Sequence, residues 1–354
     1  MTTHQGVLLL LDLTAILLAA WALGELARRL SQPAVIGEIV AGIALGPSVL
    51  GSAADKVMFP ADIRTMLAAI ANVGLAVFMF SVGLELDRGS ARRGVKAAAA
   101  VSLSSTIVPF SAGFLLAYTM LTSHDASHRA VVFAVFVGAA MSITSFPVLA
   151  RILTDHGWQR LPIGELALTS AAACNVIAWI MLAAATAMVD GSRVLWLLAL
   201  VPGYAAVMFC LVRPLLRRLV AARPSTSRLL PVMVAGLLLS GAVTEWLGLN
   251  LIFGAFLFGL IVPVDGAAQL RRALRDQLGG CCATVLLPVF FVTTGLAVNL
   301  THVGLASIGE LAMIALVASV SKYAGAFVSA RRLGFDARRS AAFATLMNTR
   351  GSPS

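Results

Sequence analysis

Residues Ala134 to Leu153 read AVFVGAAMSITSFPVLARIL, an apolar stretch long enough to cross a bilayer but interrupted near its middle. Pro147 has no backbone N–H and clashes with the preceding turn, which leaves carbonyl groups free inside the membrane. Such groups persist only where they are buried in protein or line a polar cavity. The hydroxyls of Ser142, Thr144 and Ser145 can satisfy them or help to coordinate a cation. The stretch therefore predicts either a proline kink capped by hydroxyls or part of a polar site.

The composition places the rest of the chain in lipid as well. Of 354 residues, 59% are hydrophobic and only 12% are charged, whereas soluble domains carry about 25% charged residues. Too few polar groups remain to cover a water-facing surface. Four cysteines lie in apolar stretches without metal-ligand or disulfide spacing, so we expect small core side chains and assign no metal site.

Hydropathy predicts an all-α polytopic membrane protein with about 11 complete spans and a partial twelfth. The spans are expected near residues 7–28, 34–50, 65–86, 96–121, 130–154, 163–188, 194–215, 229–246, 250–263, 279–299 and 305–330, with the twelfth beginning near Ser340. The first apolar run exceeds a signal-peptide core and lacks Lys or Arg before it, so we expect a retained span.

The basic residues support this count. Most Lys and Arg side chains lie in the odd-numbered connections, and the even-numbered ones hold only Lys56, Arg64, Arg129 and Arg193. Basic loops stay in the cytoplasm, which predicts an N-terminus outside the inner membrane. The net charge of +10 thus follows from topology, and nucleic-acid binding is not expected.

Two spans carry polar groups near mid-depth. Lys322 lies several residues from the nearest basic helix end, at Arg331, and a buried ammonium usually has a partner or a water path. Snorkelling toward the cytoplasmic surface is the alternative. Cys174 and Asn175 lie near the centre of the span at 163–188, where the amide could pack between helices or bind a ligand.

Six motifs occur in a characteristic order, and together they resemble the Kef-type monovalent cation:proton antiporters with a sodium/hydrogen exchanger domain. They are QPAVIGEIVAGIALGPSVLG (32–51), VGLELD (82–87), SITSFPVLARIL (142–153), FGAFLFGLIVP (253–263), LLPVFFVTTGL (286–296) and LMNTRG (346–351). The resemblance covers essentially the whole chain. It implies a transporter, not an enzyme, that uses no cofactor and exchanges Na⁺ or K⁺ for H⁺ by alternating access.

The resemblance also implies an inverted-repeat fold with broken helices beside a midplane ion site. On this basis Ser142, Thr144 and Pro147 become candidate site residues, and Lys322 matches the family's intramembrane lysine. Cys174 and Asn175 occupy the positions of the family's Asp-Asp or Asn-Asp pair.

That replacement predicts impaired exchange. A carboxylate can hold either a proton or an alkali cation, whereas an amide cannot titrate and a thiol is too soft a ligand. Three functions stay open: cation:proton exchange, a non-transporting degenerate or partner membrane protein, and proton-linked transport with Lys322 as the titrating group. Another acidic side chain, such as Glu165, would restore exchange if it reached the site.

The domain prediction follows from the same motifs. Residues 1–351 form the exchanger-type transmembrane domain and 352–354 a tail, with the second repeat incomplete because LMNTRG normally opens a second broken helix. H⁺, a monovalent cation and the lipid bilayer are the expected partners, and family members commonly form homodimers.

Overall fold

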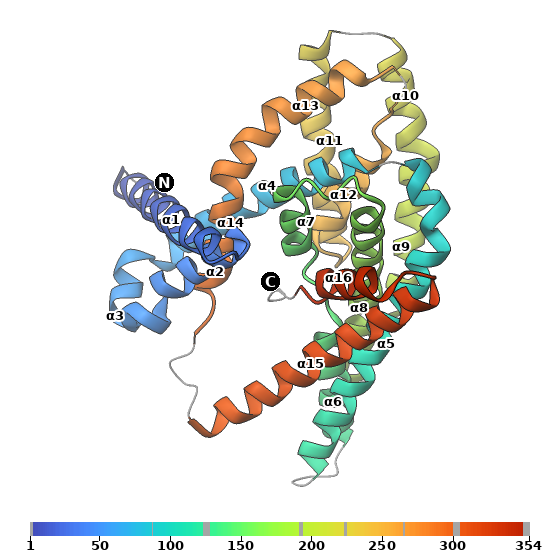
Figure 1. Cartoon of the computed structure of the whole chain (residues 1–354). Coiled ribbons are helices and arrows are strands. Elements are labelled where there is room, and N and C mark those ends of the chain that lie inside the picture. The colour runs from blue at the N-terminus through green and yellow to red at the C-terminus, as the bar shows by residue number, and fades with distance from the viewer. Residues whose placement is uncertain are drawn as a thin grey trace. The chain divides into compact units, whose positions relative to one another are not determined.

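A computed structural model describes residues 3–86, 88–122, 128–190, 194–222, 225–264, 266–299 and 305–349. All regular structure in these ranges is helical, as the sequence predicts (Figure 1). The helices are α1 Thr3–Arg29, α2 Ala34–Leu45, α3 Pro47–Met58, α4 Ala61–Glu85, α5 Arg88–Thr122, α6 His128–Ser142, α7 Phe146–Asp155, α8 Pro162–Asp190, α9 Val194–Val207, α10 Arg213–Ala221, α11 Thr226–Trp246, α12 Leu251–Ile261, α13 Ala268–Cys281, α14 Leu287–Leu296, α15 Leu305–Arg332 and α16 Ala337–Met347, with π-helical turns at Met208–Val212 and Cys282–Leu286.

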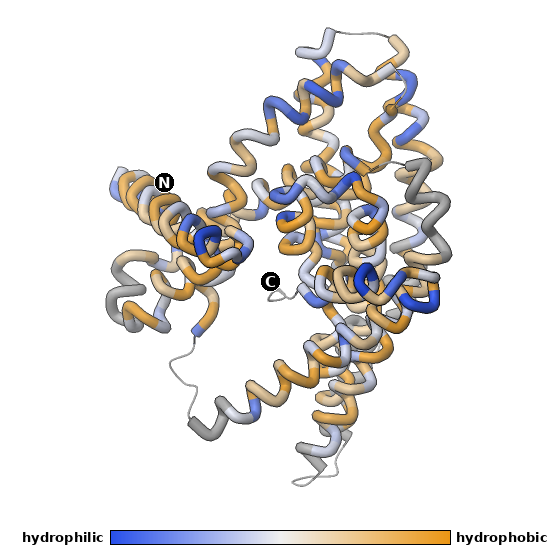
Figure 2. Tube along the Cα trace, viewed as in Figure 1, coloured by the Kyte–Doolittle hydropathy of each residue, from blue (hydrophilic) through white to orange (hydrophobic). Residues whose placement is uncertain are grey.

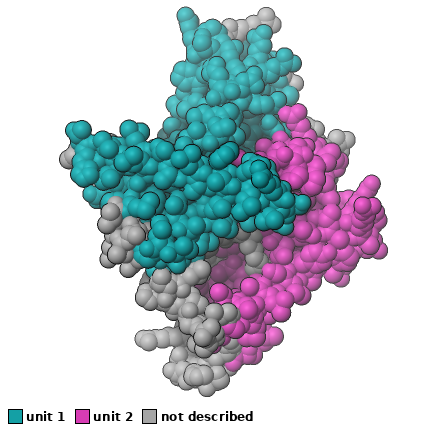
Figure 3. Space-filling model, turned by 60° about the vertical axis from the view of Figure 1, so that its left-hand side comes forward, with its two compact units in different colours: residues 1–85, 207–303, 354 teal, residues 86–206, 304–353 magenta. Residues whose placement is uncertain are grey.

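The chain divides into two compact units, each built from segments distant in sequence (Figure 3). Unit 1 contains residues 1–85, 207–303 and 354, and unit 2 contains residues 86–206 and 304–353. All residues proposed for the site lie in unit 2.

The described helices are apolar enough to span a membrane. Seven helical stretches in this part of the chain combine the length and hydropathy of a bilayer span. They are Thr3–Arg29, Ala61–Glu85, Ala97–Thr119, Phe133–Asp155, Thr226–Trp246, Ala268–Leu296 and Gly309–Arg332. Figure 2 shows hydrophobic residues along most of α1 and α15. The chain is therefore a multi-pass membrane protein, and the number of complete spans stays a prediction.

Some expected spans depart from a regular α-helix. The stretch at 34–50 ends as a helix at Leu45, and Gly46 has an extended backbone before Pro47 begins α3. The expected span at 279–299 stays helical to Leu296 but contains a π-helical turn at 282–286. Hydropathy does not report such breaks, because it measures the average polarity of a window and not the backbone path.

Glycines allow α2 to pack very closely against its neighbours in unit 1. A Cβ at Gly37 would overlap the carbonyl oxygen of Leu23 on α1, and a Cβ at Gly42 would overlap that of Val292 on α14. The facing Gly295 is equally constrained, because a Cβ there would overlap the carbonyl oxygen of Ile39. Backbones can meet this closely only where both surfaces lack side chains.

The same arrangement occurs a second time at α12. The spacing between Gly37 and Gly42 recurs between Gly254 and Gly259. A Cβ at Gly254 would overlap the carbonyl oxygen of Ser240 on α11, and a Cβ at Gly259 would overlap that of Phe80 on α4. Helices α11, α12 and α4 thus repeat the contacts of α1, α2 and α14, which is the internal repeat that the resemblance implies.

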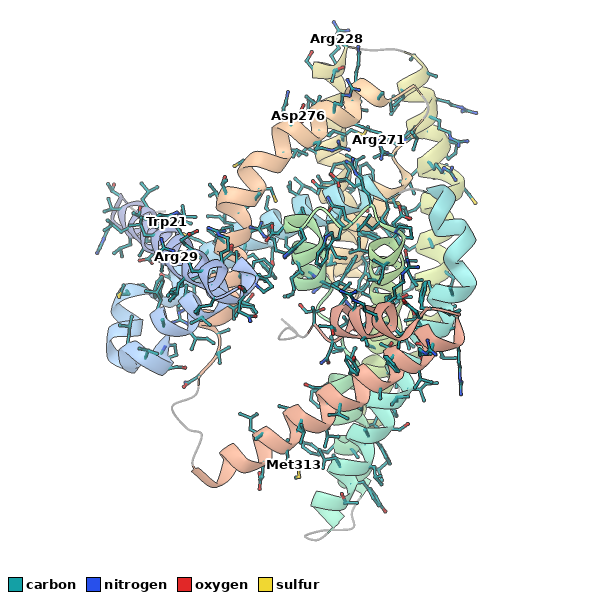
Figure 4. The ribbon with its side chains drawn as sticks, in the orientation of Figure 1. Trp21, Arg29, Arg228, Arg271, Asp276 and Met313 are labelled. Carbon is teal, nitrogen blue, oxygen red and sulfur yellow. The ribbon has the colours of Figure 1, made fainter. Side chains whose placement is uncertain are left out.

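An arginine on α13 joins the ends of two helices in unit 1. Arg271, labelled in Figure 4, donates hydrogen bonds to the carbonyl oxygens of Leu84 and Val262, near the C-termini of α4 and α12. Arg275, one turn later, pairs with Glu85 at 3.2 Å. Cationic side chains at helix C-termini satisfy orphan carbonyls and complement the helix dipole.

Candidate functional site

The membrane helix at 128–155 is broken and not merely kinked. Helix α6 ends at Ser142, Ile143 to Ser145 are irregular, and α7 begins at Phe146. Pro147 occupies the first turn of α7, where a missing N–H removes no intrahelical hydrogen bond. The structure thus shows an unwound segment in place of a simple proline kink, and the role of this segment in a polar site stays a prediction.

Groups from other helices satisfy the backbone of this break. The N–H of Thr144 donates to Asn175 Oδ1 at 3.3 Å, and the N–H of Ser145 donates to the carbonyl oxygen of Thr349 at 3.0 Å. Thr349 follows the end of α16 at Met347, so the break meets a second irregular segment of unit 2. Buried backbone groups require such partners, and these contacts hold the unwound conformation in place.

Lys322 contacts the end of helix α6. Its side chain is 0% exposed, and its ammonium donates to the carbonyl oxygen of Ser142. That carbonyl belongs to the last turn of α6, where the helix lacks its own donors and carries the negative end of its dipole. Snorkelling does not describe this side chain, because the ammonium lies inside unit 2.

Cys174 and Asn175 both face the interior from α8. Asn175 is 7% exposed and holds the break through Thr144, as described above. Cys174 is 0% exposed, and its thiol donates to the carbonyl oxygen of Ser102 on α5 at 3.5 Å. The side chains of Thr106 and Thr144 reach the thiol as well, and the charge of Lys322 acts on it. Five of the six predicted site residues are thus linked by these contacts, and Pro147 lies in the first turn of the adjoining helix α7.

Helix α5 also contributes to the site, although the sequence motifs do not indicate it. Thr106 is 1% exposed, and its hydroxyl, like that of Thr144, lies against the Cys174 thiol and forms no hydrogen bond to a nitrogen or oxygen atom in the described part of the chain. Ser102, by contrast, donates to the carbonyl oxygens of Ala98 and Ser170 at 2.6 and 3.0 Å. The run VSLSST (101–106), four hydroxyls in an apolar span, was the signal that could have identified this helix.

Acidic residues lie at the ends of the surrounding helices. Glu165 is buried in the first turn of α8, ten residues before Asn175, or about 15 Å along the helix. Asp155 ends α7 and pairs with Arg151 at 3.1 Å. The described residues contain no group of three His, Cys, Asp or Glu side chains that could hold a metal ion. The contacts described for Lys322, Cys174 and Asn175 are made with backbone carbonyl oxygens and one backbone N–H.

The chain resembles known transporters over its full length. A family profile described as "Sodium/hydrogen exchanger, transmembrane" matches residues 13–354. A Na⁺/H⁺ antiporter of Synechocystis, NhaS4, is 36% identical over 99% of this chain and 88% of its own length. Cation/H⁺ antiporter 20 of Arabidopsis thaliana is also 36% identical, but the chain spans only 43% of that protein.

Two further similarities are more distant. K⁺/H⁺ antiporter 1 of Saccharomyces cerevisiae is 30% identical over 76% of this chain and 33% of its own length. The structure of the sodium proton antiporter MjNhaP1 from Methanocaldococcus jannaschii superimposes with a TM-score of 0.70 at 15% identity, covering 96% of this chain and 82% of that one. The second similarity establishes the fold.

Proposed function

Because the chain belongs to the sodium/hydrogen exchanger transmembrane family, we propose that it exchanges a monovalent cation, Na⁺ or K⁺, for H⁺ by alternating access. The observation that carries this proposal beyond family membership is the buried Lys322 ammonium on the free carbonyl of a broken helix. A titratable group beside an oxygen ligand is what competition between a proton and an alkali cation requires.

Exchange requires that proton and cation cannot bind together. Protonated Lys322 holds the Ser142 carbonyl oxygen and places a positive charge at the break. An alkali cation there would meet both an occupied ligand and electrostatic repulsion. Loss of the lysine proton removes the charge and frees the oxygen, so that a cation can enter. In this scheme Lys322 takes the role that the sequence comparison assigns to an acidic pair.

Asn175 and Cys174 then have positioning roles. Asn175 holds the N–H of Thr144, which keeps the break unwound, and Cys174 fills the space beside Lys322 and Thr144. The alternative of a non-transporting membrane protein draws on the missing carboxylates. The relatives found are antiporters by name, and they favour exchange over that alternative.

The test is proton exchange by the purified chain in proteoliposomes that contain a pH-sensitive dye. We expect cation-induced proton release in the wild type and none in Lys322→Ala. Arg339→Gln is the matched control, since Arg339 is exposed and pairs weakly with Asp336 at 4.0 Å. Absence of exchange with every alkali cation between mildly acidic and alkaline pH would reject the proposal. Unchanged flux in Lys322→Ala would reject the role of the lysine.

The charge pattern further supports a cell-membrane protein with its N-terminus outside, and family members commonly form homodimers. Reporter fusions in two connections of opposite predicted side test the orientation. A fusion near Arg217 is expected to report the cytoplasm, and one near Arg129 the outside. The reverse result would overturn the predicted topology.

A further inference from the structure

We propose that the turn between α15 and α16 binds the headgroups of anionic phospholipids at the membrane surface. This turn, called the basic turn below, comprises residues 331–339 and contains Arg331, Arg332, Arg338 and Arg339. The proposal goes beyond exchange, since it concerns an exposed surface of unit 2 and not the buried site of that unit. It starts from the place of the turn at the end of a membrane helix.

The basic turn lies at the boundary of an apolar helix. Helix α15 has the length and hydropathy of a bilayer span up to Arg332, and α16 begins at Ala337. The four arginines are exposed, and so is Leu333, which is 37% exposed. Figure 2 shows hydrophilic residues where α15 passes into α16. Basic side chains at the end of a span lie at the level of the lipid headgroups, where each one adds to the attraction of an anionic surface.

The basic turn carries more positive charge than its own carboxylate balances. Its four arginines are accompanied by one acidic residue, Asp336. The Asp336 Oδ1 accepts a hydrogen bond from the backbone N–H of Arg339 at 3.0 Å and lies 4.0 Å from the guanidinium of the same residue. The side chains of Arg332 and Arg338 form no hydrogen bond or ion pair in the described part of the chain. Two exposed guanidinium groups are therefore available to an external anion.

Arginines at the end of α1 provide a contrast. Arg28 and Arg29 also end an apolar helix and are exposed, but both pair with Glu25, at 2.9 and 3.5 Å. Their charge is thus partly neutralised within the protein. The two helix ends carry similar side chains and differ in whether a carboxylate accompanies each guanidinium.

Hydrogen bonds fix the backbone of the basic turn. Gly334 has a left-handed conformation (φ +88°), and its N–H donates to the carbonyl oxygen of Arg331 at 3.0 Å. The N–H of Phe335 donates to the carbonyl oxygen of Ala330 at 3.2 Å, which completes a Schellman motif at the end of α15. The guanidinium of Arg331 donates to the carbonyl oxygen of Phe335 at 2.8 Å. Because this backbone is already ordered, less conformational entropy is lost when a ligand binds.

The dipole of α16 does not account for the arginines at its start. Arg338 and Arg339 lie in the first turn, which contains no acidic residue and carries the positive end of the helix dipole. Cationic side chains are unfavourable there for the helix itself. An anion bound at the surface offsets this cost together with the surplus charge of the turn.

Phospholipid headgroups match this surface in charge and in shape. A guanidinium group binds a phosphate through two parallel N–H donors. The exposed Leu333 lies between the arginine pairs in the sequence, at the end of an apolar helix. A ligand that carries both a phosphate and acyl chains contacts both kinds of surface, which favours a lipid over a free phosphate. The partner is thus a phospholipid with a net negative charge, for which phosphatidylglycerol is the probe.

A local probe measures the lipid preference of the turn in bilayers. A dye is attached to Leu333→Cys in the whole chain, with Cys210, Cys281 and Cys282 replaced by alanine, and brominated lipids that contact the dye quench it. Brominated phosphatidylglycerol is compared with brominated phosphatidylcholine. We expect a preference of about 25-fold or more for phosphatidylglycerol at low salt, and a weaker preference as the salt concentration rises.

Arginine substitutions test the charge that the proposal uses. Arg332→Gln with Arg338→Gln removes two unpaired charges and leaves the hydrogen bonds of the turn intact. We expect this double variant to lower the preference about 25-fold, or about five-fold for each charge. Arg332→Lys with Arg338→Lys keeps the charges and should retain most of the preference. Arg28→Gln with Arg29→Gln removes the same number of charges from the end of α1 and should leave it unchanged.

Competition distinguishes a lipid from a free phosphate. Glycerol phosphate in the aqueous phase should not displace phosphatidylglycerol from the turn, and displacement would overturn the lipid assignment. Equal quenching by the two lipids would overturn the proposal as well, and so would equal losses in the variants of the basic turn and of α1. These measurements use no cation gradient, so their outcome is independent of the proposed exchange.

Discussion

At position 175 an amide side chain takes the place of an acidic one and keeps its structural contact. The resemblance places it where the family carries an acid, and in this chain its amide oxygen holds the Thr144 N–H at 3.3 Å. An amide accepts a hydrogen bond as a carboxylate does, but it brings no charge. The unwound segment is therefore preserved although the acid is replaced.

Replacing Asn175 by leucine tests this positional role. The substitution leaves the buried Thr144 N–H without its acceptor, so we expect the free energy of unfolding to fall by about 1–3 kcal/mol. Asn175→Asp retains an acceptor and should cost less than the leucine variant. Chemical denaturation in detergent measures both. Equal losses in the two variants would contradict the assigned hydrogen bond.

Asp12 is an ionisable residue that is buried within an apolar helix. It is 5% exposed within α1, and its Oδ2 has no hydrogen bond in the described structure. Burial of an ionised carboxyl in a membrane helix costs about 2.5–3.5 kcal/mol on insertion scales. We therefore expect Asp12→Leu to raise the melting temperature, whereas Thr14→Leu on the exposed face of α1 should change it little. A lower melting temperature for Asp12→Leu would indicate a stabilising partner of the carboxyl.

At the scale of helices, packing depends on backbones that touch. The contact between α2 and α14 needs glycine on both sides, at Gly42 and Gly295. Its counterpart between α12 and α4 needs Gly259 and Gly83, where a Cβ would overlap the carbonyl oxygens of Phe80 and Phe256. At these helix–helix contacts the backbones touch directly, without side chains between them. A methyl group added at one of the glycines would therefore force the two helices apart.

Two glycine substitutions should therefore have opposite effects. Gly42→Ala places a methyl group against Val292 and Gly295, and we expect it to lower the free energy of unfolding by about 1–3 kcal/mol or more. Gly280→Ala on α13 meets no atom within 4 Å and should stabilise the helix by about 0.5–1 kcal/mol. Thermal melting of the two variants in one detergent compares them. Similar destabilisation by both would refute the packing argument.

Arg271 offers a test of how helix ends are joined. Its guanidinium donates hydrogen bonds to carbonyl oxygens at the C-termini of both α4 and α12. Arg271→Gln therefore removes charge-assisted hydrogen bonds from two helices. We expect a loss of about 1.5–3 kcal/mol in the free energy of unfolding. Arg272→Gln, at the exposed neighbouring position, should be close to neutral. If the two variants have the same free energy of unfolding, the contact between the ends of α4 and α12 does not depend on this arginine.

At the scale of the whole molecule, transport requires that the buried site reach water during the cycle. Cys174 is a natural reporter of this step, because it is 0% exposed and lies beside Lys322. Alternating access predicts that a small thiol reagent modifies Cys174 faster when a pH gradient drives exchange. Lys322→Ala should abolish the acceleration.

The measurement uses a protein in which Cys210, Cys281 and Cys282 are replaced by alanine, and mass spectrometry follows the modification. Cys210, restored alone, is the control: it lies on the outer surface of the helices, within an expected span, so its rate should not depend on the gradient. A Cys174 rate that ignores the gradient would argue against transient opening.

Much of this architecture could be predicted from the sequence, because its signals are local. Lipid requires long apolar helices, so hydropathy located most of them to within a few residues. Pro147 with its preceding hydroxyls indicated a kink or a polar site, and the family resemblance indicated a broken helix there. Lys322 was identified for a similar reason, since an ammonium in an apolar span is costly wherever it points. The family motifs added the repeat and the positions of Cys174 and Asn175.

Only the tertiary structure decided which groups meet. Nothing in the sequence pairs Lys322 with the Ser142 carbonyl, Asn175 with the Thr144 N–H, or Thr106 with Cys174, because each pair joins helices far apart in the chain. A hydroxyl in a helix usually bonds to its own backbone, so composition cannot tell Thr106 from Thr119. Packing makes that distinction, since it determines which side chains face the break and which remain outside it.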